Sequence, residues 1–67
     1  MIEILLNGKQ TQLKDGLTLI QIIEDLGFHS KWVVAELNGL ALMKSEYPNT
    51  ILKIGDKLEL VRAVSGG

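Results

Sequence analysis

The sequence contains no cysteine, one proline, three aromatic residues and no excess of either charge. Without cysteine, neither a disulfide nor a thiolate metal site can stabilise the chain, so burial of apolar side chains must do so. The net charge is −1 and the basic residues are scattered, which argues against a nucleic-acid-binding protein. No apolar run approaches the roughly 20 residues of a membrane helix, and the N-terminus lacks the basic segment of a signal peptide. We therefore expect a soluble, cytoplasmic protein, monomeric when free, that binds neither nucleic acid nor membrane.

The chain is 67 residues long and 46% hydrophobic, which is enough for one small core but not for two. We expect a single domain over residues 1–67, with a flexible C-terminal tail over residues 64–67.

Two stretches show the pattern of a β-hairpin. Ile2, Ile4 and Leu6 alternate with the residues between them, and residues 10–13 can return after the Asn7-Gly8 turn. Residues 32–37 and 40–42 repeat this pattern around Asn38-Gly39. In this second hairpin we expect Val34 to point outward and three side chains to point into the core: Val33, Ala35 and Leu37.

A short helix is predicted between the hairpins. Thr18 and Gln21 have the spacing of a capping box, which satisfies backbone donors of the first turn. Apolar residues at helical spacing follow, and Gly27 suits the left-handed position that ends a helix. The apolar stripe consists of Leu19, Ile22, Ile23 and Leu26.

Residues 43–54 show no clear period, and we expect irregular chain there, followed by a Gly55-Asp56 turn and a last strand over residues 57–64. The first hairpin and the last strand are both too apolar for an exposed sheet edge. Placing the last strand beside the first, in the middle of a mixed sheet, buries both under the helix. The predicted fold is therefore α+β, a ubiquitin-like β-grasp of four to five strands packed on one helix. The alternative that the sequence leaves open is an α+β sandwich with another strand order.

Few residues are candidates for catalysis. His29 is the only histidine, and a lone histidine after a helix is most simply a surface residue. The three aspartates fit turns or the outer helix face, and none stands at metal-ligand spacing with another. We therefore expect no catalytic residue, no metal site and no cofactor bound by this chain, and we predict that it is not an enzyme.

Five of the seven glycines are explained by a turn or a helix end, whereas Gly66 and Gly67 are not. Glycines without side chains can enter a narrow slot in another protein, and Gly67 offers a carboxylate that can carry a group once it is activated. On the predicted sheet, Leu5, Val34 and Val61 point away from the helix. With Ala63 beside the tail, these residues form a candidate partner-docking patch.

The whole chain resembles the sulfur-carrier family of thiamin biosynthesis, a ubiquitin-like family. The resemblance rests on "WVVAELNG", "IGDKLELVRAV" and the terminal Gly-Gly, with Tyr47 at a place where the family tends to carry an aromatic. Ser65 departs from the family, which frequently has a third glycine there.

The resemblance implies that the tail residues Ser65, Gly66 and Gly67 enter the active sites of partner enzymes. An adenylyltransferase similar to ubiquitin-activating enzymes would use ATP and Mg²⁺ to activate the Gly67 carboxylate. A persulfide donor would convert it to a thiocarboxylate, and thiazole synthase would take the sulfur. The sequence leaves three alternatives open: the small subunit of molybdopterin synthase, another sulfur carrier that serves amino-acid or tRNA thiolation, and a ubiquitin-like interaction module with an idle tail.

Overall fold

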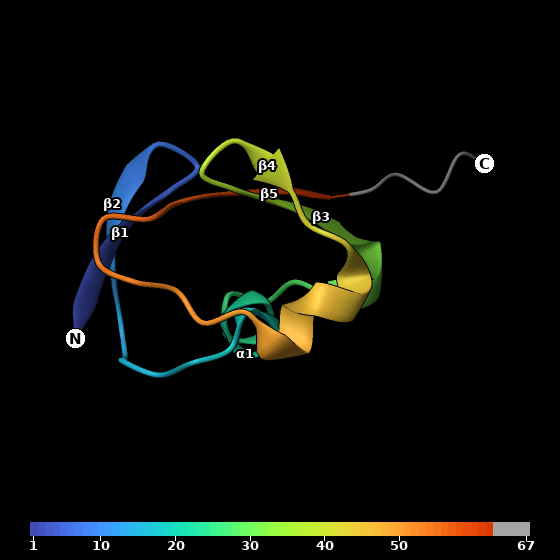
Figure 1. Ribbon diagram of the computed structural model, residues 1–67, viewed down its shortest axis with the longest axis horizontal. Coiled ribbons are helices and arrows are strands. Elements are labelled where there is room, and N and C mark those ends of the chain that lie inside the picture. Colours follow the sequence, from blue (N-terminus) through green and yellow to red (C-terminus); the bar gives the residue numbers. More distant parts are fainter. Residues whose placement is uncertain (63–67) are drawn as a thin grey trace.

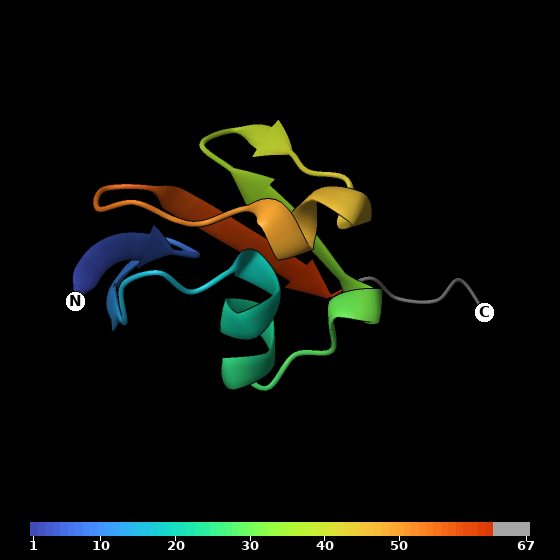
Figure 2. The same cartoon turned by 60° about the horizontal axis from the view of Figure 1, so that its bottom comes forward.

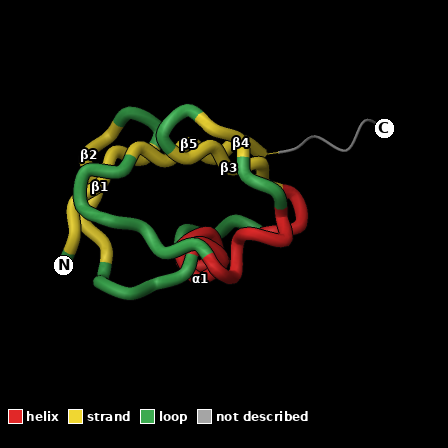
Figure 3. The backbone as a smooth tube through the Cα atoms, viewed as in Figure 1, coloured by secondary structure: helices red, strands yellow, loops and turns green. Residues whose placement is uncertain are grey.

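The strands and helices of the computed structural model form two layers, with a curved sheet on one side and the helices on the other (Figure 1; Figure 3). The structure describes residues 1–62, so the predictions about residues 63–67 lie outside the described part. The layers contain five strands and one α-helix: β1 (Ile2–Leu6), β2 (Lys9–Leu13), α1 (Leu19–Asp25), β3 (Val33–Leu37), β4 (Leu40–Ala41) and β5 (Lys57–Arg62).

The strand order is β2-β1-β5-β3-β4, so the last strand lies in the middle of the sheet (Figure 2). β5 runs parallel to β1, with Leu5 opposite Lys57, and antiparallel to β3. Both hairpins pair antiparallel. This mixed sheet on one α-helix confirms the predicted β-grasp and the central position of the last strand.

The Asn-Gly turns do more than reverse the chain. Asn7 and Asn38 adopt positive φ angles of 50° and 53°, as the hairpin prediction requires. The Asn7 amide also accepts a hydrogen bond from the Leu60 N–H (2.8 Å) and donates to the Leu60 carbonyl (3.4 Å). The side-chain oxygen of Asn38 accepts from the Lys57 N–H at 2.9 Å. Each turn therefore fastens its hairpin to β5 through a side chain, an interaction that the sequence pattern did not predict.

Helix α1 begins and ends as predicted. The Thr18 side chain accepts from the Gln21 N–H, and the Gln21 side chain accepts from the Thr18 N–H in return, which completes the capping box. At the other end, Gly27 has a φ of 87°, and the Phe28 N–H donates to the Ile23 carbonyl at 3.0 Å, as in a Schellman motif. A helix of seven residues is unstable alone, so its apolar face must pack on the sheet.

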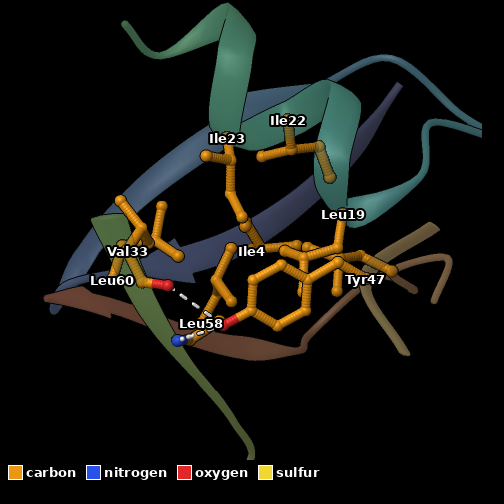
Figure 4. Close-up of a cluster of buried hydrophobic side chains, with 10 residues drawn as sticks. Ile4, Leu19, Ile22, Ile23, Val33, Tyr47, Leu58 and Leu60 are labelled. Carbon is orange, nitrogen blue, oxygen red and sulfur yellow. Dashed lines mark hydrogen bonds between the residues drawn. The ribbon is translucent and has the colours of Figure 1, made fainter. Parts of the chain in front are cut away.

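The core lies between α1 and the inner face of the sheet (Figure 4). Leu19, Ile22 and Ile23 of α1 are at most 1% exposed, as are Ile4 of β1 and Leu58 of β5. Fully burying one such side chain stabilises a protein by about 1.5–3 kcal/mol relative to leaving it exposed. These packed positions hold the short helix in place.

Residues 43–54 are not wholly irregular, and this expectation was wrong in part. Lys44–Asn49 form a 3-10 helix (η2) that carries the buried Tyr47. The Tyr47 hydroxyl donates to the Val33 carbonyl (3.1 Å) and accepts from the Ala35 N–H (3.0 Å), which Figure 4 shows as dashed lines. β4 has only two residues, so Tyr47 satisfies backbone groups of β3 that β4 does not reach. A lone tyrosine in a segment without period gave no signal of this role.

The expected start of the second hairpin at Trp32 was also wrong. Ser30–Trp32 form a 3-10 turn (η1), and β3 begins at Val33. His29 closes this turn, because its Nδ1 accepts from the Lys31 N–H and its carbonyl accepts from the Trp32 N–H. Within β3, Val33 and Ala35 are buried and Leu37 is half-buried, whereas Val34 is 44% exposed, as predicted.

Within residues 1–62, the single α-helix is far too short to cross a bilayer.

Candidate functional site

The described residues contain no group that resembles a catalytic centre. Among residues 1–62, no three His, Asp or Glu side chains gather closely enough to hold a metal ion. His29 is exposed, and its Nδ1 is engaged with the backbone of η1. Asp15 pairs with the N-terminal ammonium at 2.9 Å, and the buried Asp56 accepts hydrogen bonds from Asn38 and from the Lys53 N–H. These side chains are therefore explained by the fold.

The face of the sheet that points away from the helix is the more informative surface. β3 and β5 place two pairs of residues directly opposite one another there: Glu36 with Glu59, and Val34 with Val61. Opposite side chains on antiparallel strands have Cβ atoms about 4.5–5.5 Å apart and therefore interact. We call the pair Glu36–Glu59 the acidic rung and the pair Val34–Val61 the valine rung. Toward the end of β5, the surface thus changes from acidic to apolar.

The predicted docking patch is only partly brought together. Val34 and Val61, which are 44% and 60% exposed, form the valine rung. Leu5 lies on the same face but opposite Lys57, four residues before Val61, or about 13 Å along the strand. Glu59 lies on that face between Lys57 and Val61, so Leu5 does not join the valines. Ala63 lies outside the described residues.

The acidic rung borders an open hollow of about 420 Å³ on this face. Its lining comes from the second Asn-Gly turn and from the facing residues of β3 and β5: Glu36, Asn38, Gly39, Lys57 and Glu59. Both acids line the hollow, and sequence analysis did not include either of them among the candidate site residues. The alternation along each strand fixed their face, but their direct opposition depends on the register between β3 and β5.

The end of the described chain is anchored to the helix layer. The guanidinium carbon of Arg62, the last residue of β5, lies 5.4 Å from the centre of the Phe28 ring, a cation–π distance. Phe28 in turn packs against the core next to the end of α1. The predicted tail residues Ser65, Gly66 and Gly67 follow and lie outside the described residues. The valine rung is therefore close in sequence to the place where the tail begins.

Comparison with known proteins agrees with this architecture. A model of the ThiS family matches residues 4–67. The sulfur carrier protein ThiS of Thermus thermophilus is 37% identical over 92% of this chain and 95% of its own length. A thiazole synthase of Paramagnetospirillum magneticum is 30% identical over 98% of this chain, but the chain spans only 20% of that protein's length. The crystal structure of thiamine biosynthesis protein ThiS from Geobacter metallireducens superposes with a TM-score of 0.84, at 26% identity, over 98% of this chain and 100% of that one.

The strand order and the α-helix that packs on one face of the sheet define a protein of the ubiquitin-like β-grasp class. Within that class, the chain belongs to the ThiS family, because the family match covers residues 4–67. This result confirms the family resemblance of the sequence. It favours the sulfur carrier of thiamin biosynthesis over the small subunit of molybdopterin synthase.

Proposed function

We propose that this chain carries sulfur as a thiocarboxylate on Gly67 for the thiazole step of thiamin biosynthesis. The family match and the Thermus carrier confirm the general role, that of a sulfur carrier in thiamin biosynthesis and not of an enzyme. The family match, which runs to Gly67, is the observation that carries the proposal. The folded domain would provide the surface that partner enzymes bind.

The proposed chemistry takes place in the partners. In an adenylyltransferase, the Gly67 carboxylate attacks the α-phosphate of Mg²⁺-bound ATP, giving an acyl-adenylate and pyrophosphate. The terminal sulfur of a persulfide donor then displaces AMP, and a thiol reductant cleaves the resulting acyl disulfide to leave the thiocarboxylate. Activation is required because a carboxylate is a poor electrophile. No side chain of residues 1–62 is needed for these steps.

Thiazole synthase is the proposed sulfur acceptor. In the Paramagnetospirillum relative, a segment similar to this chain is part of a protein named thiazole synthase. Two units on one polypeptide are held at high effective concentration, which favours units that work on each other. This relative supports a direct encounter between the chain and a thiazole synthase.

The valine rung is the proposed centre of the partner-docking surface, with Ala63 next to it in sequence and Leu5 farther along the same face. Two opposed, exposed valines offer apolar area close to the start of the tail, and apolar area depleted of charge is typical of interface centres. The tail residues Ser65, Gly66 and Gly67 would then reach the partner's active site.

Intact mass measurement tests the carrier chemistry. The full chain is incubated with the adenylyltransferase of its own organism, ATP, Mg²⁺, a persulfide donor and a thiol reductant. We expect the mass gain of one oxygen replaced by sulfur, located on Gly67 by fragmentation. A chain that lacks Gly67 is the control and should gain nothing. An unchanged mass of the complete chain would favour an interaction module with an idle tail.

A charge substitution tests the docking surface. Val61→Lys should weaken binding to the partner, because an ammonium group would be desolvated in the apolar contact. Its matched control is Ile54→Lys, at a residue that is 73% exposed and outside the strands. Equal affinity of the two variants would remove Val61 from the docking surface.

A further inference from the structure

The acidic rung is an arrangement that folding alone does not favour. Glu36 and Glu59 are direct partners in the register of β3 and β5, and both are exposed. Like charges directly opposite one another on adjacent strands destabilise a sheet. The rung is located in the middle of the open face, next to the valine rung.

The described residues do not neutralise these two charges. Among residues 1–62, the only ion pair within 4 Å joins the N-terminal ammonium and Asp15. No hydrogen bond from this part of the chain reaches either glutamate side chain. Lys57 lines the same hollow, but its ammonium group is not within ion-pair distance of them. The open face therefore presents two uncompensated carboxylates side by side.

The two rungs together specify the chemistry of a partner. They are two residues apart along each strand, or about 7 Å. A surface that fits them has a cationic side chain opposite the glutamates and an apolar side chain about 7 Å away, opposite the valines. Arginine fits the first position best, because its planar group can bind two carboxylates at once. A second copy of this chain does not fit, since its own acidic rung would repel the first.

We propose that the acidic rung binds an arginine or lysine side chain of thiazole synthase while the valine rung packs against an apolar neighbour of that residue. The proposal rests on the proposed function for the identity of the partner, which the relative with both units on one polypeptide supports. Charge complementarity sets the orientation of the carrier on the acceptor, so that the tail is presented in one direction. The cost in stability of the free carrier is thus offset in the complex.

The test compares neutralised and reversed rungs in the full chain. Glu36→Gln/Glu59→Gln and Glu36→Lys/Glu59→Lys are titrated with the purified thiazole synthase of the same organism, by calorimetry and by amide NMR of the labelled carrier. The matched controls are Glu24→Gln/Asp25→Asn and Glu24→Lys/Asp25→Lys on α1, which make the same changes in net charge among exposed residues of the helix layer. These controls separate the position of the charge from the total charge.

We expect the neutralised rung to lower affinity about tenfold or more and the reversed rung to abolish binding, with both controls within about twofold of the wild type. Wild-type affinity should fall with rising salt, and the neutralised variant should lose most of this dependence. The free neutralised variant should melt about 1–5 °C higher than the wild type, since the repulsion is relieved. A gain in stability together with a loss of binding is an outcome that a purely structural role does not produce.

The outcomes separate the two proposals. If wild-type carrier binds thiazole synthase and the neutralised variant binds equally well, the role of the acidic rung is overturned while the proposed function stands. If the neutralised variant loses adenylation but not binding to thiazole synthase, the face belongs to the adenylyltransferase and this inference is wrong. If sedimentation shows self-association that the neutralised variant changes, a second copy occupies the face. A wild-type chain that does not bind thiazole synthase contradicts both this inference and the proposed acceptor.

Discussion

The same strands build two faces of the sheet that differ in almost every respect. On the face covered by α1, Ile4 and Leu58 are at most 1% exposed and pack against the helix. On the open face, β3 and β5 carry two opposed pairs, Glu36 with Glu59 and Val34 with Val61. Burial of apolar side chains on the covered face stabilises the fold, whereas repulsion across the acidic rung of the open face destabilises it. The difference teaches that the covered face maintains the fold and that the open face is available for recognition.

The largest predicted loss of stability comes from a substitution in the core of the covered face. Leu58→Ala removes a fully buried side chain from the central strand and should cost about 2–5 kcal/mol in the free energy of unfolding, through lost burial and a cavity. A domain of this size has about 3–10 kcal/mol in total, so this variant is measured by denaturant titration at low temperature.

Two variants control this comparison. Leu40→Ala makes the same chemical change at a residue that is 72% exposed, and its cost should stay within about 0.5 kcal/mol. Leu58→Met conserves volume and should cost less than about 1.5 kcal/mol, so it remains measurable if Leu58→Ala unfolds. Equal costs for Leu58→Ala and Leu40→Ala would contradict the assignment of the core.

A smaller loss in the free energy of unfolding is expected for a substitution in η2, whose Tyr47 packs in the core. Tyr47→Phe keeps the ring in the core but leaves the Val33 carbonyl and the Ala35 N–H without their partner. Unpaired buried polar groups cost about 1–3 kcal/mol, and the free energy of unfolding should fall by that amount. Amide hydrogen exchange provides a second measurement, since protection of the Ala35 amide should decrease more than that of amides in β1. Unchanged exchange at Ala35 would show that the hydroxyl does not hold the edge of β3.

In the first Asn-Gly turn, between β1 and β2, we expect a substitution to lower the free energy of unfolding by about 1 kcal/mol. Asn7→Gly retains a residue that tolerates the positive φ but deletes both hydrogen bonds to the Leu60 backbone. Exchange of the Leu60 amide should accelerate, whereas exchange at Lys57, which Asn38 holds, should not. Asn7→Ala is the companion variant, and it should cost more because alanine is strained at this φ. If Asn7→Gly were neutral, the side-chain amide would contribute nothing beyond the turn.

Sequence patterns predicted most of the covered face and little of the open one. Alternation, the Asn-Gly turns and the Thr18 capping box depend on neighbours in the sequence, so they fixed the hairpins, the helix and the inward residues. The role of Tyr47 and the Asn7 bonds to Leu60 depend on contacts across 12–53 residues, for which local patterns carry no signal.

For the candidate site, the sequence predicted which residues lie on the open face but not how they are arranged there. The sequence analysis assigned Leu5, Val34 and Val61 to the open face correctly, but it could not give the distances along the strands. The register of β5 against β1 and β3 separates Leu5 from the valines and places Glu36 opposite Glu59. A one-residue change in register would have produced different pairs from the same alternation. The strand order was predictable from hydrophobicity, whereas the chemistry of the rungs required the structure.

The smallest predicted effect has the opposite sign and sharpens the contrast between the faces. Glu36→Gln and Glu59→Gln should each raise the free energy of unfolding by about 0.2–1 kcal/mol, because either substitution removes the repulsion across the acidic rung. The double variant should gain little more than one single variant, since the repulsion can be removed only once. This non-additivity distinguishes coupled charges from a general benefit of lower charge.

Glu24→Gln on α1 is the control and should change stability by less than about 0.5 kcal/mol. Chemical denaturation at low salt measures all four variants, and the gain should shrink at high salt as the charges are screened. If the single effects simply add, Glu36 and Glu59 do not interact, and the open face carries no cost that recognition must explain.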